Sequence, residues 1–228
     1  MNSFSLFAVL GLAGVVAPAL AESLNPFVTN PSFEVPVTGC CNFPTGWSSG
    51  GPANGNAGNW NPSSDPAALI TALNGSQVAY INNYTGQDGM NNYYALDQTI
   101  SSVVFVPGVT YTLTYAVARR ADIPDPGAFR VQINGNYSPS CLTCYAITSG
   151  STGDIPVGQW ESFTVSYTAQ AADAGTSPTI YLVNDGRVAG PGLAQIEFDL
   201  VPEPGALILL GTVVTLIGIG TRRRSLNS

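Results

Sequence analysis

The stretch Thr110–Ala118, which reads TYTLTYAVA, decides the fold class. Large apolar side chains stand at every second position, at Tyr111, Leu113, Tyr115 and Val117. A period of two places these side chains on one face of a strand, and aromatic and β-branched residues are typical of strands. We therefore predict a strand with one buried face.

Similar runs extend from this stretch in both directions along the chain. They are Ser76–Ile81, Tyr94–Ile100, Phe129–Ile133, Trp160–Tyr167, Thr179–Val183 and Gln195–Leu200. Turn signals lie between them, such as Asn74-Gly75, Pro107-Gly108 and Asp185-Gly186. No helical pattern of comparable quality occurs outside the two termini. The sequence predicts an all-β fold, an antiparallel β-sandwich of jelly-roll type over residues 22–201, which is long enough to bury a core.

The N-terminus is typical of a secretory signal peptide over residues 1–21. The run Phe4–Leu20 is apolar and small, and it ends in Ala19-Leu20-Ala21, an A-x-A pattern that favours cleavage. The residues before this run include no Lys or Arg, which a signal peptide ordinarily has. A transmembrane anchor is the alternative interpretation.

The C-terminal residues 202–228 combine three signals. Pro202, Glu203 and Pro204 precede an uncharged apolar segment, 206–221, which is followed by Arg222, Arg223 and Arg224. As a helix the segment covers roughly 24 Å, short of the ~30 Å of a bilayer core, and the arginines favour the cytoplasmic side. This order resembles the PEP-CTERM sorting signal of exported bacterial proteins. The resemblance implies processing by an exosortase, with membrane anchoring first and a cell-surface or extracellular-matrix location afterwards. A plain tail anchor is the alternative.

The charge of the chain is strongly negative. It has no Lys and no His, and its 14 acidic residues against 7 arginines give a net charge of −7. Such a surface repels nucleic acid and anionic lipid headgroups. We expect no nucleic-acid partner.

Short motifs resemble the galactose-binding-like jelly roll, the fold of many carbohydrate-binding modules. In chain order they are Asn30–Glu34, Pro44–Trp47, Leu96–Ile100, Pro107–Leu113, Gly158–Trp160 and Phe198–Val201. By this resemblance, Glu34 of the opening strand and Asp199 of the closing strand bind a structural calcium ion, for which carboxylate oxygens are suitable ligands. The alternative is a pair of ordinary edge carboxylates.

The cysteines Cys40, Cys41, Cys141 and Cys144 are predicted to form structural disulfides, because an exported chain with an even cysteine count favours them. Bridges from the first pair to the second are favoured, and a local Cys141–Cys144 bridge remains open. A zinc site is disfavoured because neighbouring cysteines point apart in an extended chain and no His is present.

Catalysis has little support in the sequence. The absence of His removes the commonest general base and the Ser-His-Asp arrangement. Glycosidases need only two carboxylates, but most aspartates here lie beside Gly, Pro or Asn, where Asp usually serves in turns. The sequence therefore predicts that the protein is not an enzyme.

Aromatic and amide residues in the Gly/Asn-rich stretch 48–94 are the candidate ligand-binding residues. Trp60, Tyr84 and Tyr94 offer flat apolar faces to a sugar, and Arg119-Arg120 is either a ligand clamp or a partner for Asp122 and Asp125. The expected function is an exported, non-catalytic surface or extracellular protein that binds exopolysaccharide or another glycan. The alternative is a structural matrix protein with no small-ligand site.

Overall fold

The computed structural model describes residues 21–51, 55–84, 93–123, 125–133, 146–188 and 192–200. The predicted sorting tail, and the predicted signal peptide apart from Ala21, lie outside these residues. Across the described ranges, no helix is long and apolar enough to cross a membrane. The helical elements described there are single 3₁₀ turns: Asn25–Phe27 (η1), Pro62–Ser64 (η2), Pro66–Ala68 (η3), Thr152–Asp154 (η5) and Ala171–Asp173 (η6).

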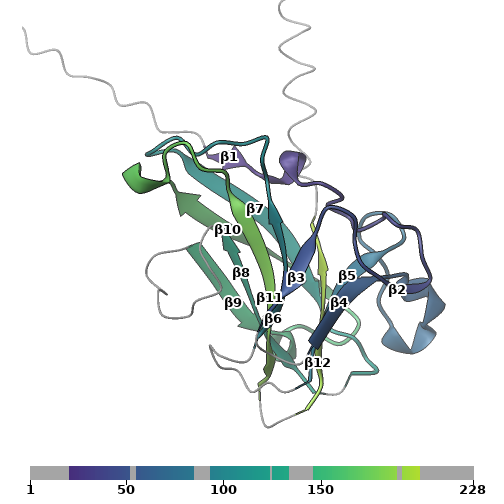
Figure 1. The fold of residues 1–228 in the computed structure, drawn as a ribbon. Coiled ribbons are helices and arrows are strands. Elements are labelled where there is room, and N and C mark those ends of the chain that lie inside the picture. The colour runs from purple at the N-terminus through teal and green to yellow at the C-terminus, as the bar shows by residue number, and fades with distance from the viewer. Residues whose placement is uncertain are drawn as a thin grey trace, which may run out of the picture.

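The larger sheet has seven strands, of which six follow the order β1-β7-β12-β5-β4-β2 (Figure 1). The strands β1 and β12 pair with different parts of one edge of β7, and β10 pairs with its other edge. The strands of this sheet are Glu22–Ser23 (β1), Cys40–Asn42 (β2), Gly55–Trp60 (β4), Val78–Asn83 (β5), Thr110–Ala118 (β7), Trp160–Thr168 (β10) and Ala194–Asp199 (β12). All pairings are antiparallel except the short contact of β1 with β7.

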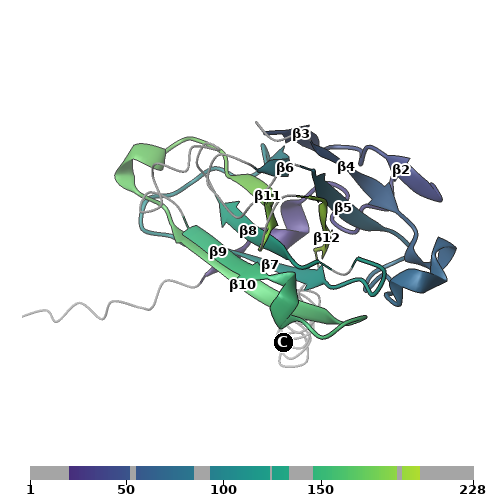
Figure 2. The same ribbon diagram turned by 90° about the horizontal axis from the view of Figure 1, so that it is seen from below.

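The smaller sheet has five strands in the order β3-β6-β11-β8-β9. They are Ser48–Gly50 (β3), Tyr94–Thr99 (β6), Gly127–Ile133 (β8), Ala146–Ser151 (β9) and Thr179–Arg187 (β11). Figure 2 shows the two sheets as the layers of a sandwich, with the blue segment that contains η2 and η3 lying beside the β2 end. The predicted all-β sandwich is confirmed.

The main core fills the space between the two sheets. The alternating residues Tyr111, Leu113, Tyr115 and Val117 are all buried there, against β-strand residues of the smaller sheet such as Leu182. The sequence pattern therefore identified the inward face of β7 correctly. Buried apolar side chains also occur on the opposite face of the larger sheet, where a second cluster forms.

Five strands, β1, β2, β3, β4 and β9, were not predicted. The sequence of β4 is GNAGNW, which lacks β-branched residues, and its glycines are required by close packing. A Cβ atom at Gly55 would lie 2.4 Å from the carbonyl oxygen of Asn82, and one at Gly58 would lie 2.7 Å from that of Asn42. The glycines of β4 make its composition look like that of a loop, but in the structure they allow neighbouring chain segments to approach the strand closely.

Candidate functional site

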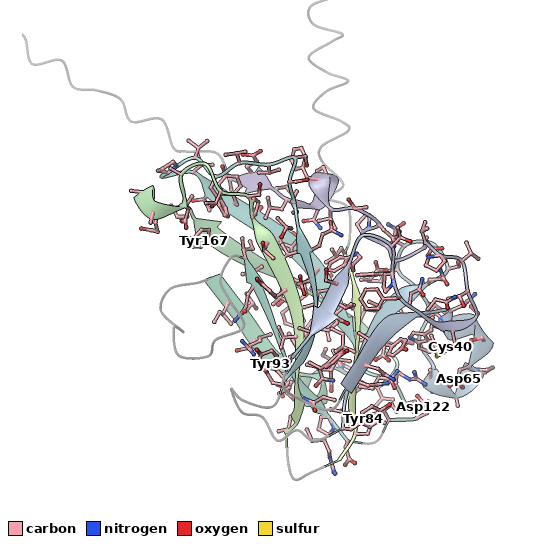
Figure 3. The ribbon with its side chains drawn as sticks, viewed as in Figure 1. Cys40, Asp65, Tyr84, Tyr93, Asp122 and Tyr167 are labelled. Atoms are coloured by element: carbon pink, nitrogen blue, oxygen red, sulfur yellow. A yellow bond between two sulfur atoms is a disulfide. The ribbon has the colours of Figure 1, made fainter. Side chains whose placement is uncertain are left out.

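A cavity of about 670 Å³ lies on the outer face of the larger sheet. Its floor comes from β4, β5 and β12, and its walls come from β2, from the segment with η2 and η3, and from the chain after β7. The lining residues are Cys40, Cys41, Asn56, Ala57, Trp60, Ser64, Asp65, Tyr80, Asn82, Tyr84, Arg120 and Gln195. Figure 3 shows Cys40, Asp65, Tyr84 and Asp122 in the same region of the molecule, with Tyr93 and Tyr167 away from it.

The strand register explains why these residues meet. Asn56 pairs with Asn82, and Asn82 pairs with Gln195, so three amide side chains form a row across three strands. In the neighbouring row, Tyr80 pairs with Glu197. Since side chains alternate between faces, both rows point away from the main core and toward the cavity side of the sheet.

Arg120 is the most highly connected side chain of the site. Its Nε donates to Asp122 at 2.8 Å, its Nη2 donates to Asp65 Oδ2 at 3.0 Å and to Asp122, and its Nη1 lies 3.5 Å from Glu197 Oε1. The guanidinium carbon also lies 4.3 Å from the ring centroid of Trp60. Burial lowers the pKa of Arg120, but the hydrogen bonds that Arg120 donates to Asp122 and the charges of Glu197, Asp122 and Asp65 outweigh this and raise it.

Glu197 is fully buried on β12, beside the lining residues Gln195 and Arg120, and is not itself among the residues that line the cavity. Its Oε1 accepts a hydrogen bond of 2.8 Å from Gln195 Nε2, whereas its Oε2 has no hydrogen-bond partner among the described residues. Burial raises the pKa of this carboxyl group to about 7, against the opposing effects of Arg120 and Gln195. A carboxyl group with this pKa is about half protonated near neutral pH, whereas an exposed Glu is ionised.

Two further polar atoms of this site are buried without a partner in the described structure. They are Asn82 Oδ1, whose amide nitrogen donates to Asn56 Oδ1 at 2.8 Å, and Trp60 Nε1. Buried polar atoms are ordinarily hydrogen-bonded, so unpaired ones at a cavity indicate a place where a bound molecule or water completes the bonding.

The predicted ligand-binding residues are divided between two places. Trp60 and Tyr84 line the cavity, with Trp60 almost fully buried and Tyr84 exposed. Tyr94 lies on β6 of the other sheet, where it packs against the main core and its hydroxyl lies 3.4 Å from Ser49 Oγ. Of the two neighbouring arginines, Arg120 lines the cavity, while Arg119 donates to the carbonyl of Gly153.

The candidate calcium residues Glu34 and Asp199 both accept hydrogen bonds from the turn before β5, and Glu34 lies outside the described strands. Glu34 accepts hydrogen bonds from the backbone nitrogens of Ser76 and Gln77, and Asp199 Oδ2 accepts one from Asn74. Asp199 Oδ1 is buried without a partner in the described structure. Burial, together with the charge of Glu34, raises the pKa of Asp199 to about 7. In the described ranges, no cluster of three or more His, Cys, Asp or Glu residues could hold a metal.

The cysteines differ from the pairing that the sequence favoured. Cys40 is bonded to its neighbour Cys41, not to the second pair, and Cys141 and Cys144 lie outside the described residues. The reason lies in the backbone. Cys40 pairs with Trp60 and Asn42 with Asn59, so Cys41 is an extra residue in a β-bulge, with φ of 75°. A bulge can turn a side chain away from the alternating pattern on which the prediction relied.

Comparison with known proteins gives one family match, to the HpiC1-like family, described as HpiC1 cyclase, over residues 25–202. No curated protein matches the chain. Among solved structures, the Stig cyclase Fisc from Fischerella sp. TAU, in complex with (3Z)-3-(1-methyl-2-pyrrolidinylidene)-3H-indole, is 20% identical with a TM-score of 0.57; the match covers 75% of this chain and 92% of that chain.

A second cyclase structure from Fischerella sp. TAU, in complex with 4-(1H-Indol-3-yl)butan-2-one, is 19% identical with a TM-score of 0.57 and the same coverage, 75% of this chain and 92% of that chain. The carbohydrate-binding module TmCBM61, in complex with β-1,4-galactotriose, is 14% identical with a TM-score of 0.47 and covers 78% of this chain and 98% of that chain. At these identities the cyclase structures show a shared β-sandwich fold, and the module carries no argument about a ligand.

The family match overturns two expectations from the sequence. The chain was expected to be a non-catalytic surface protein and not an enzyme, whereas the matched family is one of cyclases. The absence of His excluded an imidazole base but left a buried carboxylic acid available. The match ends at residue 202 and so does not bear on the sorting tail. Since it covers most of the described sandwich, the chain belongs to the HpiC1 cyclase family.

Proposed function

We propose that this protein is a cyclase that closes a ring in an aromatic substrate by acid catalysis, with Glu197 as the proton donor. The observation that carries the proposal is the buried Glu197 carboxyl group, which contacts the lining residues Gln195 and Arg120 and has one unpartnered oxygen and a pKa raised to about 7. General acids are most effective when their pKa lies near the working pH. Asp65, which lines the same cavity, is partly exposed and paired with Arg120.

The proposed chemistry needs only a proton. Glu197 protonates an unsaturated carbon of the substrate, and a π system of the same molecule attacks the cation that forms, which closes the ring. The carboxylate of Glu197 then recovers a proton from the cyclised cation, so the product is an isomer of the substrate. Gln195, which lines the cavity and donates to Glu197 Oε1, is the side chain that must turn aside to bring Glu197 Oε2 into contact with the substrate.

The lining favours a ligand with a flat apolar ring and a few polar atoms. Trp60, Tyr80 and Tyr84 supply aromatic surface, and aromatic faces also stabilise positive charge that develops nearby. Asn82 Oδ1 is an unpaired acceptor that suits an N–H group. The Fischerella cyclase structures hold indole compounds, and an indole offers such a ring and such a donor. We therefore propose an indole bearing an unsaturated side chain as the substrate class.

Glu197→Gln tests the assignment, with Glu161→Gln as the matched control, because Glu161 is an exposed glutamate on β10. Binding of 4-(1H-indol-3-yl)butan-2-one is measured by calorimetry, and isomerisation of 3-alkenyl indoles is followed by NMR. We expect Glu197→Gln to retain binding and lose ring closure, and Glu161→Gln to retain both. Equal turnover by both variants, or no binding of indoles by the wild type, would refute the proposal.

We also propose that the protein is exported and sorted through its tail, with an exosortase as the processing partner. The supporting observation is the order of Pro202-Glu203-Pro204, the apolar segment 206–221 and the arginines Arg222, Arg223 and Arg224. Replacing Pro202-Glu203-Pro204 should leave unprocessed protein in the membrane of an exosortase-bearing host. Normal processing of that variant would contradict the sorting role.

A structural calcium ion is proposed at Glu34 and Asp199, two residues along β12 from the proposed proton donor. Asp199 Oδ1 is a buried carboxylate oxygen without a partner in the described structure, and the Glu34 charge acts on the same group. A hard cation held by both carboxylates would satisfy that oxygen and remove the repulsion. Its role would be to fix the turn before β5 and the end of β12, and no step of the proposed reaction passes through it.

A further inference from the structure

The two cysteines of β2 form part of the cavity wall, and the proposed reaction does not use them. Both Cys40 and Cys41 line the cavity, although they are neighbours in the chain. Neighbouring side chains of a regular strand point to opposite faces. The bulge at Cys41 and the disulfide together hold both residues on the side of the cavity.

The chain on either side of this pair is held by other contacts: after the pair, Asn42 pairs with Asn59 on β4, and before it Thr38 and Gly39 are hydrogen-bonded. The carbonyl of Gly39 accepts hydrogen bonds from Asn61 N at 3.1 Å and from Ser64 Oγ at 3.3 Å. The backbone N–H of Thr38 donates to Gln77 Oε1 at 2.8 Å. Because these contacts do not involve sulfur, breaking the disulfide would release Cys41 without releasing the rest of the edge.

The pair is also accessible to chemical reagents. Cys40 and Cys41 are both exposed, and thiol–disulfide exchange requires access to a sulfur. In the reaction, an external dithiol attacks one sulfur, the Cys40–Cys41 bond breaks, and the reagent leaves as its own disulfide. Two electrons and two protons are transferred, and the protein keeps two thiols.

We propose that the Cys40–Cys41 disulfide is a ligand-contacting wall of the cavity, and that its reduction lets Cys41 turn to the opposite face and weakens ligand binding. The binding part of this inference rests on the proposed function. Cys40 pairs in register with Trp60, so the disulfide and the indole ring of Trp60 lie on adjoining strands at the same cavity. An apolar ring bound against Trp60 would also touch the sulfurs.

The test compares oxidised and dithiol-reduced protein by two measurements. The first is the NMR signal of the Trp60 indole N–H, assigned with Trp60→Phe. We expect reduction to shift it, while the signals of Trp47 and Trp160 stay in place, because those indoles donate to the carbonyls of Asn30 and Thr71 at other positions. The second is calorimetry with 4-(1H-indol-3-yl)butan-2-one, for which reduction should weaken binding about tenfold, the effect of losing one buried apolar group.

Two variants assign the response to the correct bond. Cys141→Ser with Cys144→Ser should keep both responses, and Cys40→Ala with Cys41→Ala should lose both while remaining folded by circular dichroism. The proposal that the Cys40–Cys41 disulfide forms the cavity wall beside Trp60 is refuted if the Trp60 signal does not shift on reduction. It is also refuted if the shift persists in the variant without Cys40 and Cys41. If the probe binds neither form while Trp60 responds, the proposal that the wall contacts a ligand falls with the indole substrate class, and the redox response of the wall stands.

Discussion

Replacing Glu197 by Gln should remove a pH-dependent loss of stability from this protein. Gln has nearly the same shape as Glu and no ionisable proton, and Arg120 would keep its contacts with Asp65 and Asp122. The folded protein favours the protonated form of Glu197, because burial raises its pKa. The unfolded chain has no such preference, so ionisation favours unfolding.

The size of the effect follows from the two pKa values. Raising the pKa from 4.5 to about 7, at about 1.4 kcal/mol for each pH unit, corresponds to about 3 kcal/mol. Below about pH 4.5 the carboxyl group is protonated in both states and has no effect. As the pH rises, the unfolded chain releases its proton first, and the folded state loses about 3 kcal/mol relative to it by the time the pH exceeds 7.

Urea unfolding at a series of pH values from about 4.5 to 8 measures this contribution. The wild type should lose about 3 kcal/mol more than Glu197→Gln over that range, and Glu161→Gln should behave as the wild type. Asp199→Asn should likewise lose less stability than the wild type over this range, because burial also raises the pKa of Asp199 to about 7. Parallel curves for the wild type and Glu197→Gln would refute the reasoning, because they would show that Glu197 is ionised at the same pH in both states.

Other changes test the metal, the core and the cavity. Chelation should lower the melting temperature and calcium should restore it, because calcium at 100-fold excess over Kd adds about 2.7 kcal/mol to the free energy of unfolding. Glu34→Gln with Asp199→Asn should abolish this response, and a melting curve that does not change with chelator would contradict the metal site. Leu182→Ala in the main core should cost about 2–5 kcal/mol in urea unfolding, and a cost below about 1 kcal/mol would contradict its tight packing. Trp60→Leu should weaken indole binding in calorimetry and remove the contact with Arg120, and unchanged affinity would place the ligand elsewhere.

The fold was predictable wherever a strand has one face in the core and one outside it. In β7 the alternation is complete, and the residues that it assigns to the core are buried. The signal fails for β4, where the residues on the face toward the core are Gly55, Ala57 and Asn59 and none is large and apolar. Its neighbours approach the backbone so closely that large side chains do not fit, and the sequence alone does not reveal that approach.

The cavity was predictable only in part. Trp60 and Tyr84 were expected to bind a ligand because aromatic residues stand out in a loop-like composition, and both line the cavity. Tyr94 has the same composition around it but belongs to the other sheet. Which aromatic residues meet depends on strand order, and β4 and β6 are close in sequence but lie in different sheets.

The proposed acid was hidden by the same alternation that revealed the fold. In the run QIEFDL, Ile196 and Phe198 occupy the core face, and Gln195, Glu197 and Asp199 take the other, which ordinarily faces water. Here that face is covered, because the second apolar cluster, which includes Ala68 and Ile70, packs over the sheet beside Tyr80. Covering removes water from Glu197 and raises its pKa to about 7, so an ordinary surface pattern yields a carboxyl group that is still partly protonated near neutral pH. A strand whose polar face alternates correctly can therefore still carry the proposed acid, and what distinguishes it is the segment that covers the strand.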